Sequence, residues 1–254
     1  MITNLTSNKM VIISDLHLGN PFSSTSHTAM SFIKWAAAQD FDICINGDGI
    51  EMAQASHSKI ISEMPEVIRT IKSLNKERHN IYYVVGNHDM SLENFLEDWG
   101  YFKVSPFLNV KSGNARVRVE HGHLYDPFYV KHPALYEKLT HLAGFLLKIS
   151  PGLYKTWIAF EKWRARARAK KTGIIGEPPE FAEAAYEISQ RGFDCVVFGH
   201  THHPGEVTLK NDKRYLNPGS WLLSCHYIEI NHGKVELKCW QPESNSLPQD
   251  SSKV

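Results

Sequence analysis

The chain has 254 residues, of which 42% are hydrophobic and 22% are charged, and its formal net charge is +1. This composition excludes an intrinsically disordered chain, and the length suits one large domain or one domain with an insertion. The near-neutral total charge gives no reason to expect nucleic acid as a partner.

Strand and helix patterns alternate in the first half of the chain. Apolar, β-branched runs predict buried strands at 10–14, 41–46 and 81–85, and helical spacing of apolar residues predicts helices at 31–39, 66–75 and 91–99. This alternation is typical of an α/β sheet.

The second half predicts mainly strands. They fall at 115–120, 195–198, 206–209, 214–216, 221–230 and 234–240, with turns at 211–212 and 231–233. We therefore expect an α/β (α+β) fold, in which a two-sheet β-sandwich is flanked by helices.

Residues 126–175 interrupt this pattern. They carry no strand signal but contain two apolar helical patterns, separated at Ser150-Pro151-Gly152. We expect a single domain over 1–241 with a helical insertion at about 126–175, followed by a flexible polar tail at 242–254.

The cysteines indicate a reducing compartment. Four of them lie in apolar, strand-like stretches without a CxxC pair: Cys44, Cys195, Cys225 and Cys239. This pattern predicts buried, reduced thiols rather than disulfides. Residues 1–10 lack the apolar core of a signal peptide, and no stretch has ~18 uninterrupted apolar residues. We expect a cytoplasmic protein without a spanning helix.

Five short polar motifs each follow a predicted strand: Asp15-Leu16-His17, Gly47-Asp48-Gly49, Gly86-Asn87-His88-Asp89, His121-Gly122-His123 and Gly199-His200-Thr201-His202. Each motif alone is typical of a turn or a cap. Strand ends along one sheet edge, however, are where α/β folds gather ligands, and glycines there allow close approach. Burying so many polar groups together without a metal ion would be unfavourable.

The donor types indicate which ions the motifs would bind. Aspartate, asparagine and histidine together suit Mn²⁺, Fe or Zn²⁺ better than Ca²⁺. An extended backbone would place Asp15 and His17 on one face, and likewise His200 and His202. The sequence thus predicts a site for two divalent metal ions.

The order of the five motifs resembles the calcineurin-like metallophosphoesterase superfamily, from Val11 to about Ser220. The resemblance implies a two-sheet sandwich that carries a two-metal phosphoesterase site. It assigns one metal to Asp15, His17, Asp48 and His202, and the other to Asp48, Asn87, His121 and His200. It also implies that His88 faces the phosphoryl oxygen or the leaving group, with Asp89 orienting its ring.

Two histidines have a second interpretation. His88 could instead be a structural hydrogen-bonding residue. His123 could hydrogen-bond a ligand of the second metal, which we favour, or could serve only in packing.

The predicted insertion concentrates positive charge. It contains ten Lys/Arg and three Asp/Glu, a net charge of +7, whereas the remaining residues hold 18 Lys/Arg and 24 Asp/Glu, a net charge of −6. One interpretation is a helical hairpin packed on the domain with a solvated basic face. The other is a lid over the metals with an apolar groove for an acyl chain, whose basic helices at 131–171 contact phosphates or an anionic membrane.

A closer resemblance favours the lid. Ser14-Asp15-Leu16-His17-Leu18-Gly19, the helical insertion and Gly199-His200-Thr201-His202-His203-Pro204 are similar to the UDP-2,3-diacylglucosamine hydrolase family. That family cleaves the pyrophosphate of a lipid-linked nucleotide in lipid A biosynthesis, with Mn²⁺, at the inner face of the membrane. The resemblance therefore implies a substrate of this kind and a peripheral location at the inner membrane.

The sequence departs from that family at three positions. His88 stands where the family usually has arginine, His123 where it has aspartate, and Gly49 where it has a larger residue. These departures leave the predicted metal ligands unchanged. They bear on which phosphate compound is the substrate.

The departures leave other functions open, among them a general phosphodiesterase. A phosphoprotein phosphatase usually adds arginines near the metals, whereas the arginine-rich stretch here lies in the insertion. A nuclease would need a broad basic groove with aromatic residues, which the sequence does not indicate outside the insertion. A non-catalytic binding module on the same fold would be expected to lose metal ligands, and here all of them are present.

Overall fold

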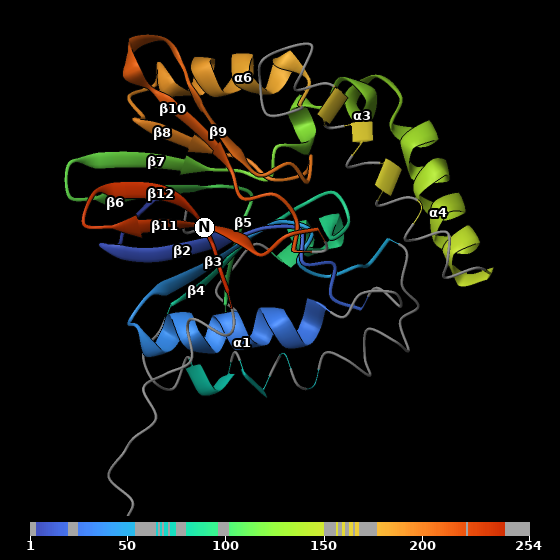
Figure 1. Cartoon of the computed structure of the whole chain (residues 1–254), viewed down its shortest axis with the longest axis horizontal. Coiled ribbons are helices and arrows are strands. Elements are labelled where there is room, and N and C mark those ends of the chain that lie inside the picture. Colours follow the sequence, from blue (N-terminus) through green and yellow to red (C-terminus); the bar gives the residue numbers. More distant parts are fainter. Residues whose placement is uncertain are drawn as a thin grey trace, which may run out of the picture.

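Two six-stranded β-sheets form the centre of the molecule, and helices cover their outer faces (Figure 1). The computed structural model describes residues 4–19, 25–53, 80–95, 102–149, 177–221 and 223–241, together with several residues between 65 and 74 and between 156 and 167. The architecture confirms the predicted two-sheet sandwich flanked by helices.

The first sheet has the strand order β12-β11-β2-β3-β4-β5. Its strands are β2 (Lys9–Ile13), β3 (Asp42–Asn46), β4 (Ile81–Val84), β5 (Lys103–Ser105), β11 (His226–Asn231) and β12 (Lys234–Cys239). β2 to β5 run parallel, whereas β11 pairs antiparallel with both β2 and β12. Nearly every residue of β2, β3 and β4 is buried, because both faces of this sheet are covered.

The second sheet has the order β1-β6-β7-β8-β10-β9. It consists of β1 (Asn4–Thr6), β6 (Leu108–Ser112), β7 (Ala115–Val119), β8 (Cys195–Val197), β9 (Gly205–Thr208) and β10 (Arg214–Asn217). β7, β8 and β10 are parallel neighbours, and β6 and β9 pair antiparallel at the two sides.

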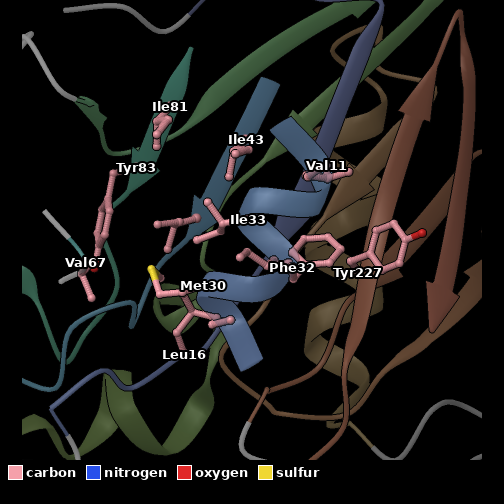
Figure 2. Close-up of a cluster of buried hydrophobic side chains, with 14 of the residues drawn as sticks. Val11, Leu16, Met30, Phe32, Ile33, Ile43, Val67, Ile81, Tyr83 and Tyr227 are labelled. Carbon is pink, nitrogen blue, oxygen red and sulfur yellow. The ribbon is translucent and has the colours of Figure 1, made fainter. Parts of the chain in front are cut away.

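Helix α1 (Thr25–Ala38) covers the outer face of the first sheet (Figure 2). Its apolar residues recur at helical spacing, and Phe32 packs with its ring centroid 4.8 Å from that of Tyr227 on β11. Burying such a side chain contributes roughly 1.5–3 kcal/mol. The helix ends in a Schellman motif, in which Asp40 has a φ of 59° and the amide of Phe41 donates to Ala36 O at 3.0 Å. The chain thereby turns directly into β3.

Two further apolar layers complete the core. One layer lies between the two sheets, where alternate residues of each sheet interdigitate, for example Ile12, Cys44 and Val197. On the far side of the second sheet, α6 (Pro179–Ser189) packs Phe181 and Ile188 against the outer face of β8 and β10. The layers therefore run α1, first sheet, second sheet, α6 (Figure 1).

The region 126–175 is helical where the structure describes it. It contains α3 (Pro127–Lys131) and α4 (Pro133–Ile149), and the described residues between 156 and 167 are helical as well. Three short 3₁₀ helices lie elsewhere in the described chain: η1 (Met90–Phe95), η2 (His123–Tyr125) and η3 (Lys210–Asp212). The predicted flexible tail at 242–254 lies outside the described residues.

Several expected elements differ in the structure. The helix expected at 91–99 is the 3₁₀ helix η1, and 96–100 lie outside the described residues. The strand expected at 221–230 begins only at His226, because the amide of Ser224 bonds back to Ser220 O and forms a turn. Cys44 and Cys195 are buried as expected and all four cysteines are free, but Cys239 is exposed on the edge strand β12.

Among the described residues, no helix combines the length and the hydropathy that a membrane span requires.

Candidate metal centre

The predicted motifs meet at the strand ends on one side of the sandwich. Asp15 and His17 follow β2, Asp48 follows β3, Asn87 and His88 follow β4, His121 follows β7, and His200 and His202 follow β8. β2, β3 and β4 are parallel neighbours in one sheet, and β7 and β8 are parallel neighbours in the other. The carboxyl ends of these strands therefore supply all the predicted ligands, as the sequence indicated.

Backbone hydrogen bonds tie the loops to one another. The amide of Asp15 donates to Gly47 O at 3.1 Å, and the amide of His17 donates to Asp48 O at 2.9 Å. The amide of His88 donates to Asp48 Oδ1 at 2.8 Å. The loops after β2, β3 and β4 thus form one hydrogen-bonded unit around Asp48.

Five of the predicted ligands have a left-handed backbone: φ is 54° at Asp15, 46° at His17, 50° at Asp48, 66° at His200 and 62° at His202. Such a conformation is uncommon outside glycine and costs roughly 1–3 kcal/mol per residue. The extended backbone expected at 15–17 and 200–202 is therefore wrong. The side chains converge because left-handed residues turn the chain sharply at each ligand.

Two glycines allow the loops to close this tightly. A Cβ atom on Gly86 would lie 2.2 Å from Asp48 Oδ1, and a Cβ atom on Gly199 would lie 2.0 Å from Ser14 Oγ. Any side chain at these positions would displace the carboxylates or the loops that carry them.

Asp15, His17 and His202 form one group of donors, with one atom of each within 4.8 Å of the others. His202 Nε2 lies 3.1 Å from Asp15 Oδ1 and 3.4 Å from His17 Nε2. Ser14 Oγ donates to the other Asp15 oxygen at 2.5 Å, which fixes the orientation of the carboxylate.

Asp48, His121 and His200 form a second group with the same spacing. His121 Nε2 lies 3.3 Å from Asp48 Oδ2, and Asn87 Oδ1 lies 3.2 Å from His121 Nε2 and 2.8 Å from His200 Nδ1. Asp48 also forms a group with His17 and His88 on its other side, so its carboxylate lies between the two sets of donors.

The donors fit divalent cations. Asp15 Oδ1 is buried and accepts no well-aligned hydrogen bond, although His202 Nε2 is near it. A buried carboxylate oxygen in this state is unfavourable unless a cation satisfies it. Burial alone would lower the pKa of His121, but Asp48 and Asp15 outweigh burial and raise it to about 10. The carboxylates therefore attract positive charge to this position.

A family model for calcineurin-like phosphoesterases matches residues 9–204, a span that contains every predicted ligand. The chain belongs to the calcineurin-like phosphoesterase family. It is a metal-dependent hydrolase of phosphoric esters.

Several known proteins are similar to this phosphoesterase. It is 26% identical to a UDP-2,3-diacylglucosamine hydrolase from Bordetella pertussis over 211 residues, 80% of each chain. It is 24% identical to the hydrolase of that name from Azotobacter vinelandii over 210 residues, 80% of this chain and 86% of the relative. A solved dimetal phosphatase from Danio rerio is 11% identical with a TM-score of 0.47, over 91% of this chain and 95% of that one.

In this phosphoesterase, the ring of His88 is held by a residue that the motifs did not single out. Glu51 Oε1 lies 2.7 Å from His88 Nδ1, and Glu51 Oε2 lies 2.7 Å from His17 Nδ1. Burial alone would raise the pKa of Glu51, but His88 and His17 outweigh it and lower the pKa to about 2. One buried carboxylate therefore orients both a predicted metal ligand and the predicted catalytic histidine.

Asp89 has a different role from the expected one. Its carboxylate accepts from the amide of Gly86 at 2.6 Å, from the amide of Gly49 at 3.0 Å and from the hydroxyl of Tyr83. No hydrogen bond joins its carboxylate to the ring of His88 among the described contacts. Asp89 thus ties the loops after β3 and β4 together, and the expected orienting role passes to Glu51.

His123 lies beside the second group without joining it. Its ring centroid lies 5.5 Å from that of His121 and 5.3 Å from that of Tyr129, and its Nδ1 is buried without a hydrogen-bond partner. Burial, together with His121 and His200, lowers the pKa of His123 to about 3. The ring is thus a neutral neighbour of the metal ligands.

The start of the insertion reaches the site. Asp126 Oδ2 lies 3.0 Å from His200 Nε2, and the rings of Tyr129 and Tyr136 have centroids 6.4 Å and 6.3 Å from that of His200. The motifs had assigned Asp126 no role beyond the start of a helical segment.

The remainder of the insertion exposes large apolar side chains beside its cations. The exposed apolar residues include Val130, Leu135, Leu139, Leu142, Phe145, Phe160 and Trp163. Lys131 and Lys138 are exposed among them. Such a surface is unusual for a helix that only covers a core.

Proposed function

We propose that this phosphoesterase holds two divalent ions, Mn²⁺ in preference to Fe or Zn²⁺, and hydrolyses a phosphate ester or anhydride of a lipid-linked nucleotide. One ion would be held by Asp15, His17, Asp48 and His202, and the other by Asp48, Asn87, His121 and His200. The observation that carries the proposal is the position of the Asp48 carboxylate, within 4.8 Å of donors from both groups. A single carboxylate between two donor sets is the arrangement that a bridged metal pair requires.

The bound ions would activate a water and offset the charge of the phosphate. The chain's own residues would do the rest. Asp48 would hold the two positions at a fixed separation, and its Oδ1 keeps the loop of His88 in place through the amide at 2.8 Å. His88 would present Nε2 to the phosphoryl oxygen or the leaving group, because Glu51 occupies its Nδ1.

The substrate proposal draws on the insertion and on the relatives. Both relatives described above are named UDP-2,3-diacylglucosamine hydrolases, which favours a nucleoside diphosphate linked to a sugar that carries acyl chains as the substrate. An exposed apolar surface next to cations is suited to acyl chains and phosphates together.

A direct test is the release of UMP from UDP-2,3-diacylglucosamine by the purified protein with added Mn²⁺. We expect UMP release that is abolished when a chelator removes the metal. Good turnover of bis-p-nitrophenyl phosphate without UMP release would reject the lipid-linked substrate and leave a general phosphodiesterase. No turnover of either compound with any of Mn²⁺, Fe²⁺ or Zn²⁺ would reject the catalytic proposal as a whole.

We propose in addition that the protein is cytoplasmic and that helices in 131–171 rest on the anionic inner membrane. A lipid-linked substrate would be presented there, and cations beside exposed leucines bind anionic lipid surfaces.

A further inference from the structure

Asp126 connects the insertion to the metal centre through the two oxygens of one carboxylate. Oδ1 caps α3, since it accepts from the amides of Phe128 at 2.8 Å and Tyr129 at 3.4 Å. Oδ2 lies 3.0 Å from His200 Nε2. The same side chain therefore fixes the first helix of the insertion and touches a predicted metal ligand.

The contact determines which nitrogen of His200 is available to a metal. A carboxylate oxygen only accepts hydrogen bonds, so Nε2 of His200 must carry the proton that is shared with Asp126. Nδ1 then keeps its lone pair, and Nδ1 is the atom that lies 2.8 Å from Asn87 Oδ1. Nδ1 of His200 and Oδ1 of Asn87 are then both acceptors, so they cannot hydrogen-bond to each other. A cation that contacts both atoms would satisfy them.

The ring of His200 is also held in place by its surroundings. Phe181 of α6 stacks on it with a centroid separation of 6.3 Å, and Tyr136 of α4 lies at the same separation. Rotation that exchanges the two nitrogens would require the start of the insertion to move. Tautomer, ring orientation and the position of α3 are thus set together.

We propose that Asp126 is a positioning residue that keeps Nδ1 of His200 free for the second metal ion and couples binding of that ion to the docking of α3. The inference rests on the two-metal function proposed above. Because linkage is reciprocal, a metal ion that favours this arrangement of His200 also stabilises the capped start of the insertion. The insertion is thereby more firmly attached when the site is loaded.

The decisive variant is Asp126→Ser. Serine is a good N-cap, so α3 keeps its cap, but its hydroxyl is too short to reach His200 Nε2. We expect one of the two Mn²⁺ ions to bind about 10–100-fold more weakly, with the affinity for the other unchanged. Calorimetric titration of metal-free protein with Mn²⁺ measures both affinities.

Amide hydrogen exchange supplies a second measurement that does not depend on activity. In the wild type, the amides of Phe128 and Tyr129 should become more protected when Mn²⁺ is added. In Asp126→Ser they should show wild-type protection without metal and no gain with metal. Glu137→Gln is a matched control, because it removes one negative charge from an exposed side chain of α4 and should leave both measurements unchanged.

The outcomes separate the inference from the function on which it rests. Two unchanged Mn²⁺ affinities in Asp126→Ser, with a wild type that binds two ions, would overturn the coupling and leave the proposed function standing. A wild type that binds no metal would overturn both.

Discussion

The carboxylate of Glu51 orients two histidines of the candidate site. Each of its oxygens lies 2.7 Å from a different histidine, so it determines how His17 faces the first metal position and how His88 faces the phosphate. Carboxylate–histidine pairs of this kind fix the tautomer and orientation of the ring. The loss of His88, which is not among the predicted ligands, should therefore impair catalysis through geometry more than through metal content.

We expect His88→Ala to lower kcat by about 10²–10⁴-fold, because a positioned acid or donor is lost. The metal content should stay near that of the wild type, since the donors in both groups remain. Glu51→Gln should lower kcat in the same direction, and it should also weaken metal binding, because Glu51 orients the predicted ligand His17 as well. Steady-state kinetics with elemental analysis measures both quantities; loss of metal from His88→Ala would make this histidine a ligand.

The sequence was most informative for the residues that occupy recognisable motifs. All seven predicted ligands lie in the two donor groups or within hydrogen-bond distance of them, because glycine and histidine spacing survives as a pattern along the chain. Glu51 and Asp126 were missed because their roles depend on contacts with residues far away in sequence. A carboxylate three residues after Asp48, or at the start of a helix, has no distinctive spacing of its own.

At the scale of strands and helices, the central parallel strands and the late strands β9 to β12 were predicted, whereas the short edge strands β1 and β5 were not. β2, β3, β4 and β8 are buried apolar runs, and β7 alternates apolar residues with arginines, so the sequence pattern identified all five. β1 and β5 have three residues each, too few for a pattern. β6 and α6 were also missed. In β6 the buried residues Leu108, Val110 and Ser112 alternate with less buried ones, and α6 has an amphipathic spacing.

Asp194 joins three strands of the second sheet near the start of β8. Its carboxylate accepts from Lys213 Nζ at 2.9 Å and from the amide of Arg116 at 3.0 Å. Partial burial would raise the pKa of Asp194, but these two hydrogen bonds outweigh it and lower the pKa. A carboxyl group whose pKa is lower in the folded state stabilises the protein at pH values above the ordinary pKa of an aspartate. This stabilisation is lost as the pH falls through the pKa of the folded state.

We expect Asp194→Asn to lower the free energy of unfolding at pH 7 by about 0.2–1 kcal/mol, the range for a largely exposed pair. The difference from the wild type should shrink as the pH falls from 7 to below the ordinary aspartate pKa of about 3.9, because the stabilisation is lost over that range. Urea unfolding across this pH range measures the change. Asp212→Asn, in the exposed turn η3, is the control, and an equal loss of stability there would reject the argument.

On the scale of the whole molecule, charge is divided between the insertion and the rest of the chain. The net charge is +7 over 126–175 and −6 elsewhere, so the nearly neutral total conceals two parts of the sequence with opposite net charge. The metal-binding end of the sandwich and the start of the insertion adjoin each other (Figure 1). A membrane that attracts the insertion would therefore bring the site close to its surface.

We expect the protein to co-sediment with vesicles that contain anionic phospholipid and to remain in solution with purely zwitterionic vesicles. Lys131→Glu with Lys138→Glu should weaken binding by about tenfold or more, since each cation near such a surface contributes about 1 kcal/mol. Lys34→Glu with Lys72→Glu changes the charge equally on exposed residues away from the insertion and should have little effect. An equal loss of vesicle binding in both double variants would reject the insertion as the contact surface.

The placement of β11 has a consequence for how the protein is made. β2, near the amino terminus, pairs on one side with β3 and on the other with β11, which is synthesised more than 200 residues later. Until then, a growing chain exposes an unpaired and strongly apolar strand edge, a template for wrong pairing between chains. Truncation before His226 should therefore yield aggregates during translation rather than a smaller soluble domain, even though every metal ligand would already have been synthesised.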